Sequence, residues 1–121
     1  MTKEGVATIR IVAFVVAFVT LAACSPSGPP ADFASLKPSE SRLAALYEQS
    51  CKACHTNRNS GAPLVHDHAA WDPRWDKGLD VLTQHAIAGF GAMPAGGQCA
   101  ACKLDDYRRL IRFMADREKE Q

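Results

Sequence analysis

Two cysteines and a histidine stand close together in the stretch Cys51-Lys-Ala-Cys54-His55. Thiols at this spacing can add to the two vinyl groups of a haem. The adjoining histidine then lies under the iron, where a neutral imidazole nitrogen can bind the metal. A redox dithiol and half of a zinc site are the alternatives, but a dithiol does not need the neighbouring histidine. The motif therefore predicts one covalently bound haem c, with His55 as an axial ligand.

A methionine in a glycine-rich loop is the candidate for the second axial ligand. Met93 precedes a proline within residues 90–97, a stretch too rich in glycine for a helix. A thioether is a soft, weak ligand that suits haem iron. Met93 also follows His55 by 38 residues, enough chain to return to the opposite haem face. Because the other internal methionine, Met114, lies on the apolar face of a predicted helix, we expect Met93 to be the sixth ligand rather than a buried hydrophobic side chain.

The loop after the haem motif contains a candidate partner for the histidine. A ligating histidine usually donates its second ring N–H to a carbonyl or a carboxylate, which fixes the orientation of the ring. Residues 56–70 lack helical periodicity and are rich in turn-forming residues. Pro63, in this loop, is the candidate for the carbonyl that faces His55. A loop proline without this role is the alternative.

The N-terminus has the layout of a secretory signal. Lys3 and Arg10 precede an uncharged, largely apolar run over residues 11–23, which ends in small residues. A membrane-spanning helix needs roughly 20 apolar residues, so an uncleaved anchor is the second choice. We therefore expect residues 1–23 to be removed on export.

The end of that run resembles the lipobox of bacterial lipoproteins, in the form Leu-Ala-Ala-Cys at residues 21–24. The resemblance implies that Cys24 becomes the mature N-terminus and carries several acyl chains, which anchor a protein stably. Ordinary cleavage that leaves Cys24 as a stray thiol is the alternative. The expected location is the periplasmic side of the bacterial cell envelope, with the lipid in a membrane.

Proline, glycine and serine are dense in residues 24–38, which predicts a flexible tether between the anchor and a domain at 39–121. Without Lys3, Arg10 and Glu4 of the predicted signal, the 14 basic and 13 acidic residues become 12 of each. The mature protein is therefore neutral and has no basic block, so nucleic acid is not an expected partner.

Two of the five cysteines are left after the lipid and the haem are assigned: Cys99 and Cys102. An exported protein meets an oxidising compartment, where a disulfide can persist. A bond between these two closes a very small ring and stabilises by ~2 kcal/mol or less. Its expected role is to stiffen the chain between Met93 and the last helix. A redox-active pair is the alternative.

Apolar residues recur at spacings of three and four in three segments, which predicts helices. Ser39 is the expected N-cap of the first helix. A short helical turn is expected from Trp71, with Asp72 as its cap and Pro73 in its first position. No segment shows the alternation typical of strands, so the fold class is all-α. The three helices are expected at about 40–52, 79–89 and 104–117.

In this order the features resemble the class I cytochromes c, and closely the bacterial cytochrome c5 group. The resemblance covers roughly residues 47–114. It rests on a tyrosine four residues before the haem motif and on these segments: Gly-Ala-Pro at 61–63, Ala-Ala-Trp-x-Pro-Arg at 69–74, His-Ala-x-x-Gly-Phe at 85–90, Met-Pro at 93–94 and Cys-x-Ala-Cys at 99–102.

The resemblance implies a small cytochrome c fold of three to five helices around one haem with an exposed edge. It also implies axial ligation by His55 and Met93 and a hydrogen bond from His55 to the Pro63 carbonyl. It further implies a disulfide between Cys99 and Cys102.

The resemblance also makes Trp71 and Arg74 candidates for hydrogen bonds to the haem propionates. Packing or a surface position is the alternative for either residue.

His66 and His68 depart from the pattern of the group. A loop histidine in place of Met93 is one reading of them, and surface histidines are the ordinary one.

A six-coordinate iron has no vacancy for a substrate, which predicts a carrier of single electrons and not an enzyme. We expect a monomer that docks weakly, through the exposed haem edge, with respiratory redox proteins.

A gas sensor or haem enzyme with a labile sixth ligand is the second hypothesis. A zinc module built from the four cysteines at 51, 54, 99 and 102 is the third, although its 44-residue gap exceeds the roughly 15–20 residues of common zinc sites.

Overall fold

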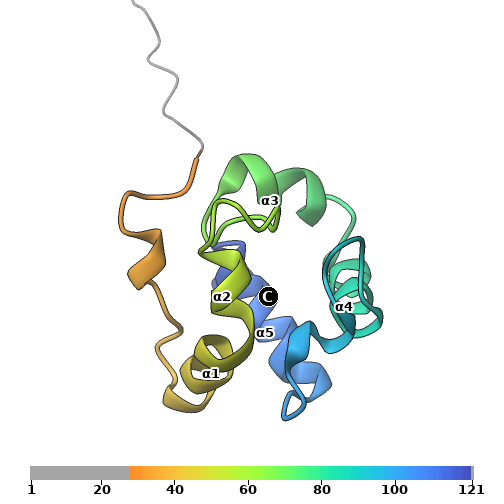
Figure 1. The fold of residues 1–121 in the computed structure, drawn as a ribbon. Helices are drawn as coiled ribbons and strands as arrows, with labels where there is room; N and C mark the ends of the chain where they lie inside the picture. Colours follow the sequence, from red (N-terminus) through yellow and green to blue (C-terminus); the bar gives the residue numbers. More distant parts are fainter. Residues whose placement is uncertain (1–27, 121) are drawn as a thin grey trace, which may run out of the picture.

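The computed structural model describes residues 28–120, so the predicted signal and Cys24 lie outside the described residues. Every regular element in that range is a helix, and a single isolated bridge joins Phe90 to Met93. The predicted all-α class is confirmed. The elements, shown in Figure 1, are η1 (Phe33–Ser35), α1 (Ser41–Leu46), η2 (Tyr47–Cys51), α2 (Lys52–His55), α3 (His68–Trp75), α4 (Leu79–Ala88), η3 (Ala95–Gln98) and α5 (Leu104–Met114).

The first helical stretch runs from α1 through η2 to α2 and ends on the haem motif, as the sequence predicts. Glu40 rather than Ser39 caps it, because a carboxylate oxygen of Glu40 accepts a hydrogen bond from the amide of Arg42 at 2.9 Å. Its middle, η2, is a π-helix, whose wider turn was not predicted. Such turns occur frequently at functional sites, and here the turn ends on Cys51, the first cysteine of the haem motif.

α3 begins at His68, earlier than predicted, because a different aspartate caps it. Asp67 accepts a hydrogen bond from the amide of Ala70 at 3.4 Å. The prediction that Asp72 caps the helix was therefore wrong. Pro73 lies inside the helix instead of at its start, and its missing N–H removes one backbone hydrogen bond.

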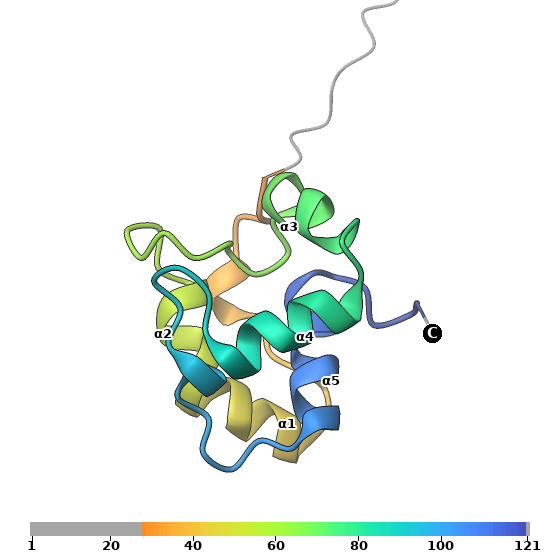
Figure 2. The ribbon, with the colours of Figure 1, turned by 90° about the vertical axis from the view of Figure 1, so that its right-hand side faces the viewer.

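α5 contributes much of the hydrophobic core. Its buried apolar side chains are Leu110, Ile111, Phe113 and Met114. The ring of Tyr47 meets the ring of Phe113 edge to face, with 5.0 Å between centroids, and joins the first helical stretch to α5. α4 packs beside α5 (Figure 2), and Arg108 pairs with Asp80 between them. The core therefore joins α1 and α4 through α5.

Part of the segment predicted as a tether is packed on the domain. Phe33, in η1, is only 7% exposed and belongs to the core. The guanidinium of Arg58, in the loop after the haem motif, lies 4.8 Å from the centroid of the Phe33 ring. In Figure 1 this orange segment runs alongside α1 and α2. Residues 33–35 of the predicted tether are therefore part of the packed domain.

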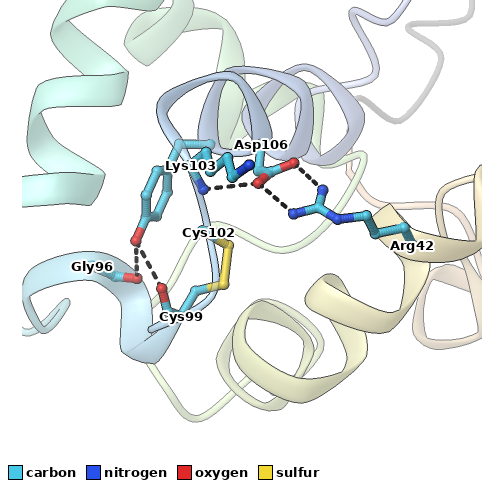
Figure 3. The surroundings of a disulfide bond; sticks show 7 residues. Arg42, Gly96, Cys99, Cys102, Lys103 and Asp106 are labelled. Carbon is cyan, nitrogen blue, oxygen red and sulfur yellow. Dashed lines mark hydrogen bonds and ion pairs between the residues drawn. A yellow bond between two sulfur atoms is a disulfide. The ribbon is translucent and has the colours of Figure 1, made fainter.

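The start of α5 is held by a buried carboxylate. Asp106 is 4% exposed and accepts hydrogen bonds from the two terminal guanidinium nitrogens of Arg42 at 2.5 and 3.0 Å. It also accepts one from the amide of Lys103 at 2.8 Å (Figure 3). The bond from Arg42 and then that from Lys103 lower the pKa of Asp106 to about 2. Asp106 therefore caps α5 and ties it to α1.

Replacing this carboxylate should reduce stability in a pH-dependent way. Asp106→Asn is expected to lower the free energy of unfolding at pH 7 by up to about 2 kcal/mol. Arg42 is half-exposed, so solvent screens its attraction to Asp106, and the measured loss should be smaller than this upper value. Because the folded pKa lies below the unfolded one, the contribution is complete above about pH 4 and is lost as the pH falls toward 2. Urea unfolding of both proteins at pH 7 and near pH 2 measures it. An equal difference at both pH values would contradict this assignment.

Candidate haem site

The two cysteines of the haem motif lie one helical turn apart, at the junction of η2 and α2. Both are free thiols; Cys51 is half-buried and Cys54 is exposed. Burial, followed by the neighbouring Cys54, raises the pKa of Cys51 to about 11. The raised pKa keeps the Cys51 thiol protonated at pH 7, and neither cysteine forms a disulfide, so the helix presents two thiols beside the histidine.

His55 is buried at the end of the same helix, with 6% of its surface exposed. Its Nδ1 lies 2.7 Å from the carbonyl oxygen of Pro63, the residue that the sequence analysis selected for this contact. A carbonyl only accepts, so the bond requires the Nδ1–H tautomer and leaves Nε2 with a lone pair for a metal. Burial lowers the pKa of His55 below its ordinary value, against the opposing effect of the Pro63 bond. The ring is therefore neutral at pH 7, which is the form that binds iron.

Trp71 packs against His55. The two rings are stacked, with 5.9 Å between centroids and 24° between planes. The indole N–H of Trp71 donates to the carbonyl of Leu64 at 2.8 Å, and Arg74 donates to the carbonyl of Ala70 at 2.5 Å. The guanidinium of Arg74 has further N–H donors beyond this bond. A role of Trp71 and Arg74 toward the haem propionates therefore stays a prediction beside the packing and surface roles.

Met93 lies in the loop after α4, where its backbone is fixed. Its amide donates to the carbonyl of Phe90 and its carbonyl accepts from the amide of Phe90, both at 3.0 Å. Its side chain is half-buried and packs against the core. Met114, in contrast, is buried on α5 as expected. Met93 is therefore the methionine whose thioether is presented from a loop.

The zinc hypothesis has no support in the described part of the chain. Cys99 and Cys102 are joined by a disulfide, with 5.4 Å between their Cα atoms. Within residues 28–120 no three histidine, cysteine or acidic side chains gather closely enough to hold a metal ion. The four cysteines therefore do not form one site.

The two loop histidines that depart from the pattern of the group have different surroundings. His68 lies 3.4 Å from Asp72 and 3.2 Å from Asp116. The ring of His66 contacts that of Phe113, and its Nε2 is buried with no hydrogen-bond partner among the described residues.

The thiols of Cys51 and Cys54 lie beside the neutral imidazole of His55. These three groups fit haem c, whose attachment requires two thiols and a histidine at this spacing.

Comparisons with known proteins decide the family. A family model described as cytochrome c oxidase, cbb3-type, subunit III matches residues 38–114. Cytochrome c5 of Ectopseudomonas mendocina is 45% identical over 72 residues, which cover 58% of this chain and 83% of that protein. This chain is a class I c-type cytochrome of the cytochrome c5 family. The family expected from the ordered motifs is thus confirmed.

Further relatives agree with this assignment. Cytochrome c5 of Azotobacter vinelandii is 42% identical over 67 residues, covering 54% of this cytochrome and 81% of that protein. Cytochrome c-555 of Chlorobaculum tepidum is 35% identical over 79 residues, covering 62% and 73%. A chain in a crystal structure described as an electron transfer complex of nitrite reductase with cytochrome c is 30% identical, with a TM-score of 0.57. The match covers 65% of this cytochrome and 96% of that chain.

These relatives establish the general role. This cytochrome carries one covalent haem c and transfers single electrons; it is an electron carrier and not an enzyme. Among residues 28–120, none of the helices has the length and apolar character needed to cross a bilayer.

Two features of the site were missed by the sequence analysis. The π-turn of η2 leaves no mark in the spacing of apolar residues. The close approach of Met93 to Gly97 was also missed: a Cβ built on Gly97 would lie only 3.2 Å from the Met93 methyl carbon. The pair Gly96-Gly97 was a signal for it, because adjacent glycines mark a backbone that needs unusual angles or close contact.

Proposed function

We propose that this cytochrome is a lipid-anchored carrier that moves single electrons between respiratory redox proteins on the periplasmic side of a bacterial membrane. The buried, neutral His55, held by Pro63 at the end of a helix with two free thiols, is the observation that carries the proposal. Bound haem supplies the chemistry, a reversible one-electron change at iron.

Each residue of the site has a defined task in this proposal. Cys51 and Cys54 would hold the haem through thioethers, and His55 Nε2 and the Met93 thioether would bind its iron. Pro63 fixes the His55 ring and raises its basicity by accepting the Nδ1–H bond. With both axial positions taken by protein groups, no site is left for a substrate.

Redox proteins are the proposed partners. A similar chain, 30% identical, is described in an electron transfer complex with nitrite reductase, which supports an oxidoreductase as one partner of this cytochrome. Interfaces of this class are small, commonly below about 1,200 Å². We therefore expect weak, short-lived docking by a monomer at the exposed haem edge.

The proposed anchor would hold the domain close to the membrane. Eight residues, 25–32, lie between Cys24 and Phe33, which is packed in the core. Fully extended, they reach roughly 30 Å. The packed η1 therefore gives a shorter reach than residues 24–38 would give if all of them were free.

The central test is a haem stain on a denaturing gel, together with oxidised and reduced absorption spectra. A covalent haem that survives denaturation and a ferric absorption band from methionine–iron bonding, at the red end of the spectrum, are expected. A colourless protein, or one whose haem is lost on the gel, would refute the proposal.

Cys24→Ser tests the anchor. The variant is expected to move from the membrane fraction to the soluble periplasmic fraction with an unchanged absorption spectrum, because the lipid and the haem lie at separate sites. Fractionation followed by haem staining measures it, with Ser27→Ala as the control that stays in the membrane fraction. Wild-type protein found wholly in the soluble fraction would rule out lipidation.

A further inference from the structure

The turn that follows Met93 has an unusual backbone. Gly96, Gly97 and Gln98 have positive φ angles of 69°, 55° and 61° in succession. Left-handed backbone is uncommon, and for a residue other than glycine it is costly unless the surroundings impose it. Gly96 and Gly97 adopt this backbone readily, so the cost falls on Gln98, whose conformation needs contacts that hold it.

Those contacts come from α5. The Tyr107 hydroxyl is within hydrogen-bonding distance of two carbonyl oxygens, that of Gly96 at 3.0 Å and that of Cys99 at 3.2 Å. Figure 3 shows these two oxygens together beside the Cys99–Cys102 disulfide. Burial raises the pKa of Tyr107, so its hydroxyl keeps the proton that it donates. Because a hydroxyl has one proton, it donates to one of these carbonyls at a time, and it lies between the two ends of the turn.

The same turn touches Met93. A Cβ built on Gly97 would lie 3.2 Å from the Met93 methyl carbon, so the methyl group fills the space that a side chain at position 97 would need. The backbone of Met93 is fixed by Phe90, and its methyl group lies beside Gly97. Movement of the turn would change the space available to the thioether.

The tyrosine is itself well fixed. It follows Asp106, which ties the first turn of α5 to Arg42 on α1 and to the amide of Lys103 (Figure 3). We propose that Tyr107 is a positioning residue for the Met93 ligand, its hydroxyl holding the 96–99 turn against the thioether and so slowing the release of Met93 from the haem iron. This inference rests on the proposed ligation by Met93.

Tyr107→Phe tests the inference, since it deletes the hydroxyl and keeps the ring. Exogenous imidazole binds the ferric holoprotein only when methionine leaves, so its binding reports that release. The variant is expected to bind imidazole roughly three to ten times faster, the factor that follows from the loss of one hydrogen bond. The methionine–iron band should be retained but titrate away at lower imidazole concentration.

Tyr47→Phe is the matched control. The Tyr47 hydroxyl is buried and has no hydrogen-bond partner among the described residues, so its deletion should leave imidazole binding unchanged. Gly97→Ala is a second probe, because the new methyl group would press on Met93 in a backbone that disfavours alanine. It is expected to speed imidazole binding as well.

The outcomes separate this inference from the proposed function. A Tyr107→Phe protein that unfolds more readily in urea but binds imidazole at the wild-type rate would overturn it, as would an equal increase in Tyr47→Phe. If Met93→Ala leaves the spectrum and imidazole binding unchanged, the ligand assignment itself is wrong. If Met93→Ala changes the spectrum and imidazole binding while Tyr107→Phe changes neither, Met93 is the ligand but Tyr107 does not position it.

Discussion

Replacing Met93 by alanine is expected to convert this electron carrier into a protein that binds ligands at the haem. The ferric methionine–iron band should disappear, and carbon monoxide should bind rapidly to the reduced variant, because alanine has no atom to offer the iron. Loss of a thioether ligand should also lower the reduction potential, by on the order of 0.2 V within the ≈ 0.8 V range that axial ligands span. Absorption spectra, stopped-flow carbon monoxide binding and a redox titration measure these changes.

Met114→Leu is the control for this prediction. Met114 is the other methionine of the described residues and is buried in the core on α5. Leucine conserves its volume, so the change should cost less than about 1.5 kcal/mol and leave the spectrum intact. Rapid carbon monoxide binding by the reduced wild-type protein would favour a gas sensor or haem enzyme over an electron carrier. An unchanged band in Met93→Ala would require another ligand, and His66 and His68 would be the next residues to replace.

The chemistry of the site could be predicted because it depends on residue types at short spacing. The two thiols and the histidine lie on one helical stretch, so five consecutive residues define them. The starts of α4 and α5 were also predictable. Gly78 precedes the periodic residues of α4, and two acidic residues, Asp105 and Asp106, open the apolar periodicity of α5. Gly89 shows why α4 ends where it does: its φ is 88°, and a Cβ would lie 3.0 Å from the amide of Ala95.

Other features depend on contacts between distant segments, which no local pattern reports. Phe33 is the one aromatic residue in a segment rich in proline and serine, and it is buried by contacts with Arg58 and the core. Asp67 and Asp72 are both suitable caps by residue type, and only the path of the preceding loop selects Asp67. The sequence placed Tyr107 on an apolar face, but its hydroxyl bonds to the 96–99 turn. Tertiary geometry decides each of these cases.

The largest effect on the cofactor is expected from the double replacement of Cys51 and Cys54 by alanine. Without either thiol no thioether can form, so the haem stain on a denaturing gel should be lost completely. The gel and the absorbance ratio of haem to protein, both measured on protein exported by the same host, test this prediction. Since bound haem stabilises only the folded state, the variant should also unfold at lower temperature than the wild type.

The second cysteine pair of the chain provides a control of the same spacing. The double variant Cys99→Ala, Cys102→Ala removes the disulfide that follows the Met93 loop. It leaves the two thiols of the haem motif in place. It should retain the full haem stain and lose about 2 kcal/mol of stability or less, because the closed ring is small. Two results would show that haem is not attached at the haem motif. One is haem that stays attached when Cys51 and Cys54 are replaced, and the other is haem that is lost when Cys99 and Cys102 are replaced. The ligand positions derived from that motif would then have to be abandoned.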